Sequence, residues 1–421
     1  MENGPEPLKH LFQQEFARMV AVISQQFGLR HIELAEDIVS ETFLLAAETW
    51  GVGGMPNKQT AWLYTVAKQK TLHHIRRRKL LNDKIIPEFA ARQSEPDDWD
   101  TLDFSDETIR DSQLQMLFAI CTPLIADEAQ IGLALRILCG FGIDEIADAF
   151  LTNKETINKR LFRAKEKLRA RTVKLELPPA AELVRRLDRV LHVIYLLFNE
   201  GYYSRTQNRV LQKEVCLEAL RLGHILTAYE PANGPKTNAL LALMCFHASR
   251  FDARSGRGSD GYDRQSGDDL LILYEQQNET LWDTALVRQG FTYLAESLRG
   301  DELTAYHLEA RIASWHCMKE DTPEKWGSIL ALYDQLLAIN NSPSVALNRT
   351  YALYKTAGRE AALPTAENLN LKTNHLYFML LGELYQETDL LRAMAQFRQA
   401  YTLAKTETDR QFIQQKIKRL L

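Results

Sequence analysis

Apolar residues recur every three or four positions along most of this 421-residue chain. That spacing places them on one face of an α-helix. Runs that alternate apolar and polar residues, as half-buried strands do, are scarce. The pattern therefore predicts an all-α protein, and the length is sufficient for two or three domains with buried cores.

Two amphipathic helices are predicted at the N-terminal end. The apolar face of the first runs from Leu8 to Phe27, and Gly28 ends the helix. The second covers about Ile32 to Trp50, with apolar residues on one side and acidic residues on the other. These acids are Glu33, Glu36, Asp37, Glu41 and Glu48. On charge pattern alone, an acidic face of this kind is usually solvated surface.

A third helix, from Ala61 to Arg78, follows a glycine-containing loop. Trp62 and Leu63 open its apolar side, and its end is strongly basic. Basic residues near a helix C-terminus also suit the helix dipole, so this cluster has a structural explanation as well as a functional one.

Two further helices with a tight break between them are predicted within residues 141–171. The first is short, about 143–150. The second begins after Asn153, a favourable N-terminal cap, and carries one narrow apolar stripe. That stripe consists of Ile157, Leu161, Ala164 and Leu168. A short helix, a brief turn and a longer helix is the form of a DNA-reading helix-turn-helix.

The charge distribution is informative although the formal net charge is only −4. Residues 68–84 carry seven basic residues and one acid, and residues 154–174 carry nine basic residues against two acids. Between them, residues 93–111 carry eight acids and one base. We expect this acidic segment to be a linker, acting either as a passive tether or as a DNA mimic that occupies the basic faces. The charge of the basic helix in residues 154–174 has an alternative explanation, because the solvent-exposed side of a helix in a bundle can also be basic.

These motifs resemble a known family. Glu145-Ile146-Ala147, followed by Thr156-Ile157, Arg160-Leu161 and Arg163-Ala164-Lys165, resembles region 4 of sigma-70 family sigma factors. That region reads the −35 promoter element. The segment AEDIVSETF, residues 35–43, is similar to the region 2 signature, whose acidic face binds the clamp of RNA polymerase.

The resemblance implies roles for particular side chains. Contact with core RNA polymerase is assigned to Glu36, Asp37 and Glu41. Recognition of the −10 element, partly as unpaired bases in a pocket with a basic track beside it, is assigned to the loop and the third helix. The residues concerned are Asn57, Lys58, Lys68, Lys70, His73, His74, Arg76 and Arg77. The −35 element is assigned to Lys154, Thr156, Asn158, Lys159, Arg160 and Arg163.

The chain departs from the family pattern at two positions. Leu151 stands where the turn commonly has glycine, and a left-handed backbone strains a leucine, so we expect a different turn geometry. His73 stands where many relatives have aspartate. Because adjacent side chains on a helix point about 100° apart, His73 and His74 do not suggest a metal site.

The C-terminal part, after Pro178-Pro179, is predicted to be helical and has no comparable basic cluster. The motif at Leu347 to Tyr351 recurs 34 residues later at Leu381 to Tyr385, and a following A-x3-F-x2-A pattern resembles a tetratricopeptide repeat. We expect stacked helix pairs near 305–339, 343–367 and 373–405, with a capping helix from about 407. Such arrays bind peptides or act as scaffolds.

Other features set limits on the chemistry. The five cysteines form no C-x-x-C pair, which fits a reducing compartment rather than disulfides or zinc. The sequence shows no nucleophile–base pair, no Walker loop and no spacing of residues that is typical of metal ligands. We therefore expect no catalytic activity, no cofactor and no bound metal. The N-terminal residues lack a secretion signal and no apolar run reaches membrane-spanning length, so we expect a cytoplasmic location and no membrane contact.

Nearly the whole chain resembles extracytoplasmic-function sigma factors with a C-terminal tetratricopeptide-like extension. The expected division is region 2 (1–82), acidic linker (83–111), region 4 (112–177) and the extension (178–421, repeats clearest in 305–421). The resemblance implies core RNA polymerase and promoter DNA as partners, and the extension is expected to have a protein or peptide partner. The extension either inhibits the DNA-binding half or is required for its activity.

Two alternatives come from other classes of protein. One is an ordinary helix-turn-helix regulator of transcription with a ligand- or peptide-sensing helical domain. The other is a tetratricopeptide scaffold whose basic helices are incidental. The N-terminal eighty residues favour the sigma factor, because a plain regulator has no need of the region 2 signature.

Overall fold

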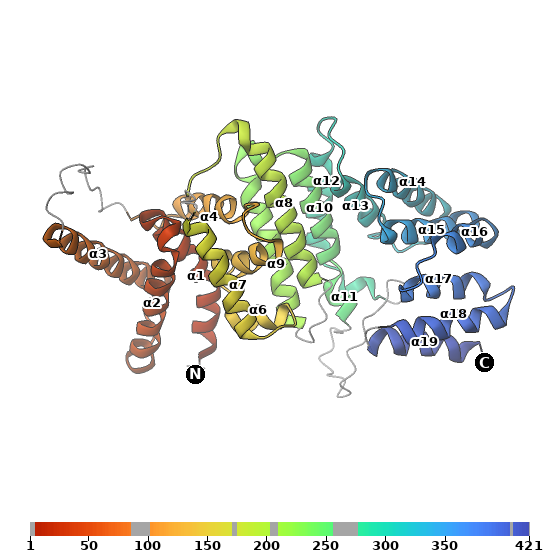
Figure 1. Ribbon diagram of the computed structural model, residues 1–421, viewed down its shortest axis with the longest axis horizontal. Coiled ribbons are helices and arrows are strands. Elements are labelled where there is room, and N and C mark those ends of the chain that lie inside the picture. The colour runs from red at the N-terminus through yellow and green to blue at the C-terminus, as the bar shows by residue number, and fades with distance from the viewer. Residues whose placement is uncertain are drawn as a thin grey trace. The chain divides into compact units, whose positions relative to one another are not determined.

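The computed structural model describes residues 5–85, 102–170, 175–202, 209–255, 277–404 and 407–420. Across these residues every regular element is helical, with nineteen α-helices and short 3-10 or π turns between some of them (Figure 1). The all-α prediction is confirmed. The chain divides into two compact units, residues 1–206 with 224–232, and residues 207–223 with 233–421.

The first unit holds the elements that bear the candidate site. Its helices are α1 (Pro5–Phe27), η1 (Leu29–His31), α2 (Ile32–Gly53), α3 (Gln59–Ile85), α4 (Asp106–Ile120), α5 (Asp127–Leu133), the π turn η4 (Ala134–Leu138), α6 (Ile143–Ala149), α7 (Lys154–Ala170), α8 (Ala180–Tyr202) and η5 (Glu230–Ala232).

Helices α1, α2 and α3 pack together at the start of this unit. Gly28 and Gly54, both with positive φ (73° and 81°), end α1 and α2 without the steric cost that a side chain would bring. Phe12 meets Phe43 edge to face, with ring centroids 4.9 Å apart. The predicted ends of the first two helices are therefore confirmed to within a few residues.

Helix α4 starts earlier than the sequence suggested. The expected linker extends to residue 111, but α4 begins at Asp106. Ser105 caps it by accepting a hydrogen bond from the Thr108 N–H at 3.3 Å, and acidic residues in the first turn suit the helix dipole. Local capping therefore outweighs the high charge of this stretch. Residues 86–101, most of the predicted linker, lie outside the described residues.

The turn between α6 and α7 differs from our expectation. Leu151 has a φ of 47°, so the left-handed geometry is kept although the residue is not glycine. The Leu151 N–H donates to the Asp148 carbonyl at 3.0 Å, and the Thr152 N–H donates to the Ala147 carbonyl at 2.9 Å. This pair of bonds is the Schellman pattern of a helix end. The two hydrogen bonds offset the strain of the left-handed backbone at Leu151, which is about 1–2 kcal/mol. Our expectation that the turn would adopt a different geometry was therefore wrong.

Helix α8 belongs to the first unit, although the sequence placed it at the start of the extension. It packs on α4 and α5 through its apolar side. Arg186 Nη2 donates to the Phe118 carbonyl at 2.6 Å, and Arg189 pairs with Asp127 at the start of α5. The domain boundary at residue 178 stays a prediction.

The second unit is a series of helices. They are α9 (Arg209–Thr227, most of it in this unit), α10 (Pro235–Ala248), α11 (Phe251–Ser255), η7 (Glu279–Leu281), α12 (Thr284–Ser297), α13 (Ala305–Trp315), α14 (Pro323–Ile339), α15 (Pro343–Ala357), α16 (Arg359–Leu369), α17 (His375–Tyr385), α18 (Leu390–Leu403) and α19 (Glu407–Arg419).

The three C-terminal helix pairs and the last helix match the predicted positions closely. Within the third pair, Gly382 of α17 lies against the ring of Phe397 of α18, where an added Cβ would come within 2.6 Å of that ring. Ala393 and Ala400 flank Phe397 and are fully buried. Small residues thus let these two helices approach closely, as the repeat pattern required. Their assignment to the tetratricopeptide family stays a prediction.

Candidate nucleic-acid interface

Helix α7 is held in place by its apolar stripe. Ile157, Leu161, Ala164 and Leu168 are each at most 4% exposed, as predicted from their spacing. The helix begins at the predicted cap, where Asn153 Oδ1 accepts a hydrogen bond from the Thr156 N–H at 2.8 Å. The stripe packs on α5 and α6 and fixes which sides of α7 remain available. Two polar stripes flank it, and they have different surroundings.

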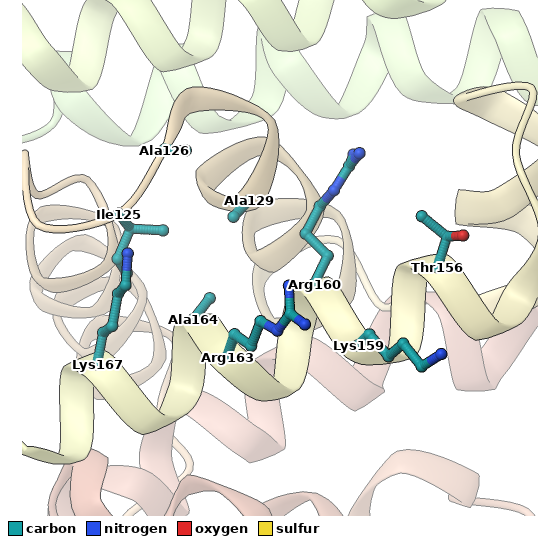
Figure 2. A pocket seen from close by; sticks show the side chains of 9 residues that line it. All are labelled: Ile125, Ala126, Ala129, Thr156, Lys159, Arg160, Arg163, Ala164 and Lys167. Carbon is teal, nitrogen blue, oxygen red and sulfur yellow. The ribbon is translucent and has the colours of Figure 1, made fainter.

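One polar stripe of α7 is cationic and borders an open cavity. The cavity has a volume of about 380 Å³, and Figure 2 shows its lining from α7 and from the chain entering α5. The lining residues are Ile125, Ala126, Ala129, Thr156, Lys159, Arg160, Arg163, Ala164 and Lys167. Four residues assigned to the −35 element from sequence therefore share one surface: Thr156, Lys159, Arg160 and Arg163.

Individual contacts orient this cationic stripe. Lys159 Nζ lies 2.7 Å from Glu155 one turn earlier, and the Arg160 guanidinium lies 5.5 Å from the centre of the Phe150 ring. Burial raises the pKa of Glu200 in α8, and the positive charge of Arg160 opposes that shift.

The other polar stripe of α7 faces α2. Lys165 pairs with Glu36, and Arg169 Nη2 lies 2.6 Å from Glu33 Oε2. Asn158 lies on this side, in a smaller cavity of about 270 Å³ with Phe162 and Lys165. The structure therefore does not bring Asn158 together with the cationic stripe. Lys154, at the start of the helix, pairs with Asp144 of α6 at 2.5 Å.

The acidic residues of α2 are divided between two environments. Glu36, which the pattern placed on the solvated side, is only 6% exposed, because α7 and the π turn cover it. Asp37 and Glu41 are exposed, with Leu44 (61% exposed) a turn further along. Partial burial raises the pKa of Asp37, and the negative charges of Glu36 and Glu41 raise it further.

The residues assigned to the −10 element are spread over α3 and the loop before it. Lys70, His73 and Arg77 follow at positions i, i+3 and i+7, so they lie along one side of the helix. Asn57, Lys58, His73, Arg76 and Arg77 are exposed, and Lys68, Lys70 and His74 are half-buried. The structure brings Lys70 and His74 close to Glu41, which the resemblance assigned to polymerase contact.

Sequence reasoning missed two residues of these surfaces. Lys167 belongs to the cationic stripe, and it follows Arg163 by four residues, a spacing that predicts the same helix face. Leu44 is an exposed apolar residue within the acidic side of α2, and its position seven residues after Asp37 was the available signal.

In the described part of the chain, no helix is long and apolar enough to cross a membrane. No group of three or more histidine, cysteine, aspartate or glutamate side chains there is placed to hold a metal ion.

Comparison with known families identifies the N-terminal helices. The family described as "Sigma-70 region 2" matches residues 12–80, which comprise most of α1, α2 and α3. The protein thus carries a sigma-70 region 2 domain at this end, which supports a role in transcription initiation. A second family, described as "Family of unknown function (DUF6596)", matches residues 186–298, from within α8 to the end of α12.

One relative matches almost the full length. The chain is 31% identical over 400 residues to "Uncharacterized protein R00370" of Rhizobium meliloti (strain 1021), an alignment that covers 93% of this chain and 91% of that one. The chain belongs to the same family as that protein. No solved structure matches it.

Proposed function

We propose that this protein is an extracytoplasmic-function type sigma factor, which binds core RNA polymerase and directs it to promoters, with a regulatory C-terminal helical extension. The observation that carries the proposal is the match of residues 12–80 to sigma-70 region 2. That match includes α2, which bears the exposed acids, and most of α3, which bears the cations.

Contact with polymerase is proposed for the exposed side of α2. Asp37 and Glu41 supply negative charge there, and Leu44 supplies an apolar side chain between solvated acids. Protein–protein contacts combine an apolar centre with a polar, solvent-accessible rim. We therefore assign Leu44 to the same contact as the two acids.

Contact with the −35 element is proposed for the cationic stripe of α7. Lys159, Arg160, Arg163 and Lys167 follow one side of a helix that is anchored by its opposite, apolar side. Such a helix can enter a major groove with its long cations divided between base edges and phosphates. Asn158 is left out of this contact, because it faces α2.

The −10 element is assigned to the exposed side of α3 and the loop before it. Arg76 and Arg77 extend the cationic side beyond Lys70, which provides a track for a displaced single strand. Asn57 and Lys58 lie in the loop at the opposite end of α3.

A second candidate is a helix-turn-helix regulator with a sensing helical domain. The cationic stripe supports this regulator as much as it supports a sigma factor, because such a stripe is sufficient for binding duplex DNA. The region 2 match does not favour it, because a regulator that only occupies duplex DNA needs no such domain.

The experiment that separates the two adds the purified protein to core RNA polymerase on genomic DNA and maps transcription start sites. A sigma factor creates a defined set of new start sites that share sequence elements near −35 and −10. If core polymerase with the protein starts at the same positions as core polymerase alone, the proposal is wrong.

A further inference from the structure

Arg160 differs from the neighbouring cations of α7 in its surroundings. Its guanidinium carbon lies over the Phe150 ring, 5.5 Å from the ring centre. Arg160 is half-buried, whereas Lys159, Arg163 and Lys167 are exposed. Figure 2 shows the Arg160 side chain extended away from α7 at the edge of the cavity. Because a guanidinium is attracted to an aromatic face and stacks on it as a plane, the ring gives Arg160 a preferred direction.

The position of the Phe150 ring is fixed by the end of α6. Phe150 follows the last residue of that helix, and its N–H donates to the Ile146 carbonyl at 3.1 Å. The next two N–H groups, those of Leu151 and Thr152, make the Schellman bonds that end the helix. The chain reverses at the left-handed Leu151, so the ring at the end of α6 meets α7 at Arg160. The turn therefore places the ring as well as joining the two helices.

The backbone beneath Arg160 is fixed as well. Leu161, the next residue of α7, is 4% exposed and packs so closely on Gly132 of α5 that an added Cβ there would lie 3.3 Å from it. The Arg160 side chain is thus held at both ends, at its Cα by the packing of α7 and at its guanidinium by the ring. Lys159 is held less firmly, because it pairs with Glu155 through side chains that are 64% and 76% exposed.

A guanidinium held in one direction is suited to reading a base. Arginine recognises guanine in the major groove through two hydrogen bonds, to O6 and N7, and this pairing requires one orientation of the planar side chain. A phosphate makes no such demand, because a flexible point charge is sufficient to bind it. Fixing a side chain before binding also reduces the conformational freedom that is lost on binding. The contact with Phe150 therefore favours sequence readout at Arg160 over contact with the DNA backbone.

We infer that Arg160 reads one guanine of the −35 element and that Phe150 is the positioning residue that orients it, while Lys167 binds phosphate. These roles rest on the proposed contact of α7 with promoter DNA, and they divide the cationic stripe into a base reader and a phosphate contact. The competing explanation is that the Phe150–Arg160 contact only fastens α6 to α7. Loss of the ring would then lower stability without changing which sequences are bound.

The test measures sequence preference directly. Full-length protein with core RNA polymerase is bound to promoter duplexes whose −35 segment, upstream of a mapped start site, is randomised, and the bound duplexes are sequenced. The wild type should prefer guanine at one position that depends on Arg160. Arg160→Lys keeps the charge but loses the planar group, so it should lower that preference by about 5-fold or more, the lower end of the discrimination given by a bidentate pair. Preferences at other positions should remain.

Variants of Phe150 separate positioning from packing. Phe150→Leu and Phe150→Met remove the ring but keep an apolar side chain, and should lower the same guanine preference by about 2- to 5-fold, the range for an accessible cation–π contact. Phe150→Tyr keeps the ring and should retain the preference. Thermal unfolding of each variant identifies any loss of stability.

The control variant is Lys167→Gln. It should weaken binding to all sequences alike, and should lower the slope of log affinity against log salt concentration by about one unit. The Phe150 variants should leave that slope unchanged, because they remove no phosphate contact. Wild-type guanine preference in the Leu and Met variants, whether or not they unfold at lower temperature, overturns the role of Phe150. Unchanged preferences in Arg160→Lys overturn base readout by Arg160.

Failure of the proposed function has a different signature, namely that no start site depends on the protein. A random duplex library is then selected with the protein alone. A guanine preference that falls in Arg160→Lys and in Phe150→Leu supports the two roles under those conditions. A wild-type profile without any guanine preference overturns them.

Discussion

Lys70 of α3 donates a hydrogen bond from Nζ to Glu41 Oε2 of α2 at 2.8 Å. The bond lowers the pKa of the Glu41 carboxyl and joins the acidic side of one helix to the cationic side of the next. A residue assigned to polymerase contact thus touches a residue assigned to the −10 element. The two proposed surfaces are adjacent, so binding of one partner is expected to affect the other.

The first prediction concerns the exposed acids of α2. Asp37→Arg combined with Glu41→Arg should abolish retention of core polymerase, because it reverses the charge of the proposed contact. Both side chains are exposed, so the free energy of unfolding should change by no more than about 1 kcal/mol, including loss of the Lys70 pair. Affinity capture with core polymerase, together with thermal unfolding, checks both statements.

The matched control lies on α4. Glu107→Arg with Asp111→Arg makes the same charge change, at the same spacing, on exposed positions of a different helix. Retention of polymerase should survive it. Normal retention by the Asp37 and Glu41 double variant would remove the basis for the polymerase contact.

The second prediction concerns Leu151. Its left-handed backbone is strained and its side chain is 58% exposed, so glycine there loses little buried surface and removes the strain. After allowing for the greater freedom of glycine in the unfolded chain, Leu151→Gly should stabilise the protein by about 0.5–1 kcal/mol. Urea unfolding measures this. If the variant is less stable, the Leu151 side chain contributes more to the free energy of unfolding than the backbone strain costs.

The sequence predicted well those features that depend on local spacing. The stripe at Ile157 and Leu161, the cap at Asn153 and the three C-terminal helix pairs all follow from helical periodicity and capping preferences. At Asp106 the high charge of the segment led us to expect a linker, although Ser105 before it is a favourable N-terminal cap and starts the helix there.

Contacts between distant segments could not be predicted in this way. Glu36 and Lys165 are 129 residues apart, and nothing in either helix marks them as partners. Periodicity placed Glu36 with the solvated acids and left Lys165 with the other bases, because it says which residues share a face but not what covers that face. The turn at Leu151 was also not predicted, because a preference of one residue does not include the two hydrogen bonds that the whole turn makes.

The third prediction concerns truncation. Removing everything after residue 177 deletes α8, which contributes Leu187, Leu191 and Ile194 to the core of the first unit. We expect residues 1–177 to lose promoter-dependent transcription, because the apolar surfaces of α4 and α5 would be exposed and the unit loosened. The comparison is made with full-length protein at matched, verified folding by circular dichroism. Higher activity in the truncated form would make the extension an inhibitor.

The fourth prediction concerns pH and His316. Burial lowers its pKa to about 3, and the charges of Arg250 and Lys325 lower it too. In the unfolded chain the pKa is about 6.5. Between these values the unfolded state binds a proton that the folded state does not, so the free energy of unfolding falls as the pH falls.

The contribution of His316 is about 1.4 kcal/mol per pH unit, or roughly 2 kcal/mol between pH 6.5 and pH 5. His316→Phe, which cannot titrate, should flatten the pH dependence of unfolding of the second unit by about that amount. Urea unfolding at pH 7 and pH 5 gives the difference. An unchanged pH dependence in the variant would show that other groups determine acid sensitivity.

The most direct measurement is run-off transcription from a mapped promoter, with core RNA polymerase in the presence and absence of this protein. We expect one transcript of defined length that depends on the protein. Lys159→Ala with Arg163→Ala should reduce that transcript, since each lost base contact costs roughly 1–3 kcal/mol and each lost phosphate contact weakens binding to all promoters alike. If the protein binds the promoter duplex without polymerase and yields no transcript with it, the protein is a duplex-binding regulator and the sigma factor account is contradicted.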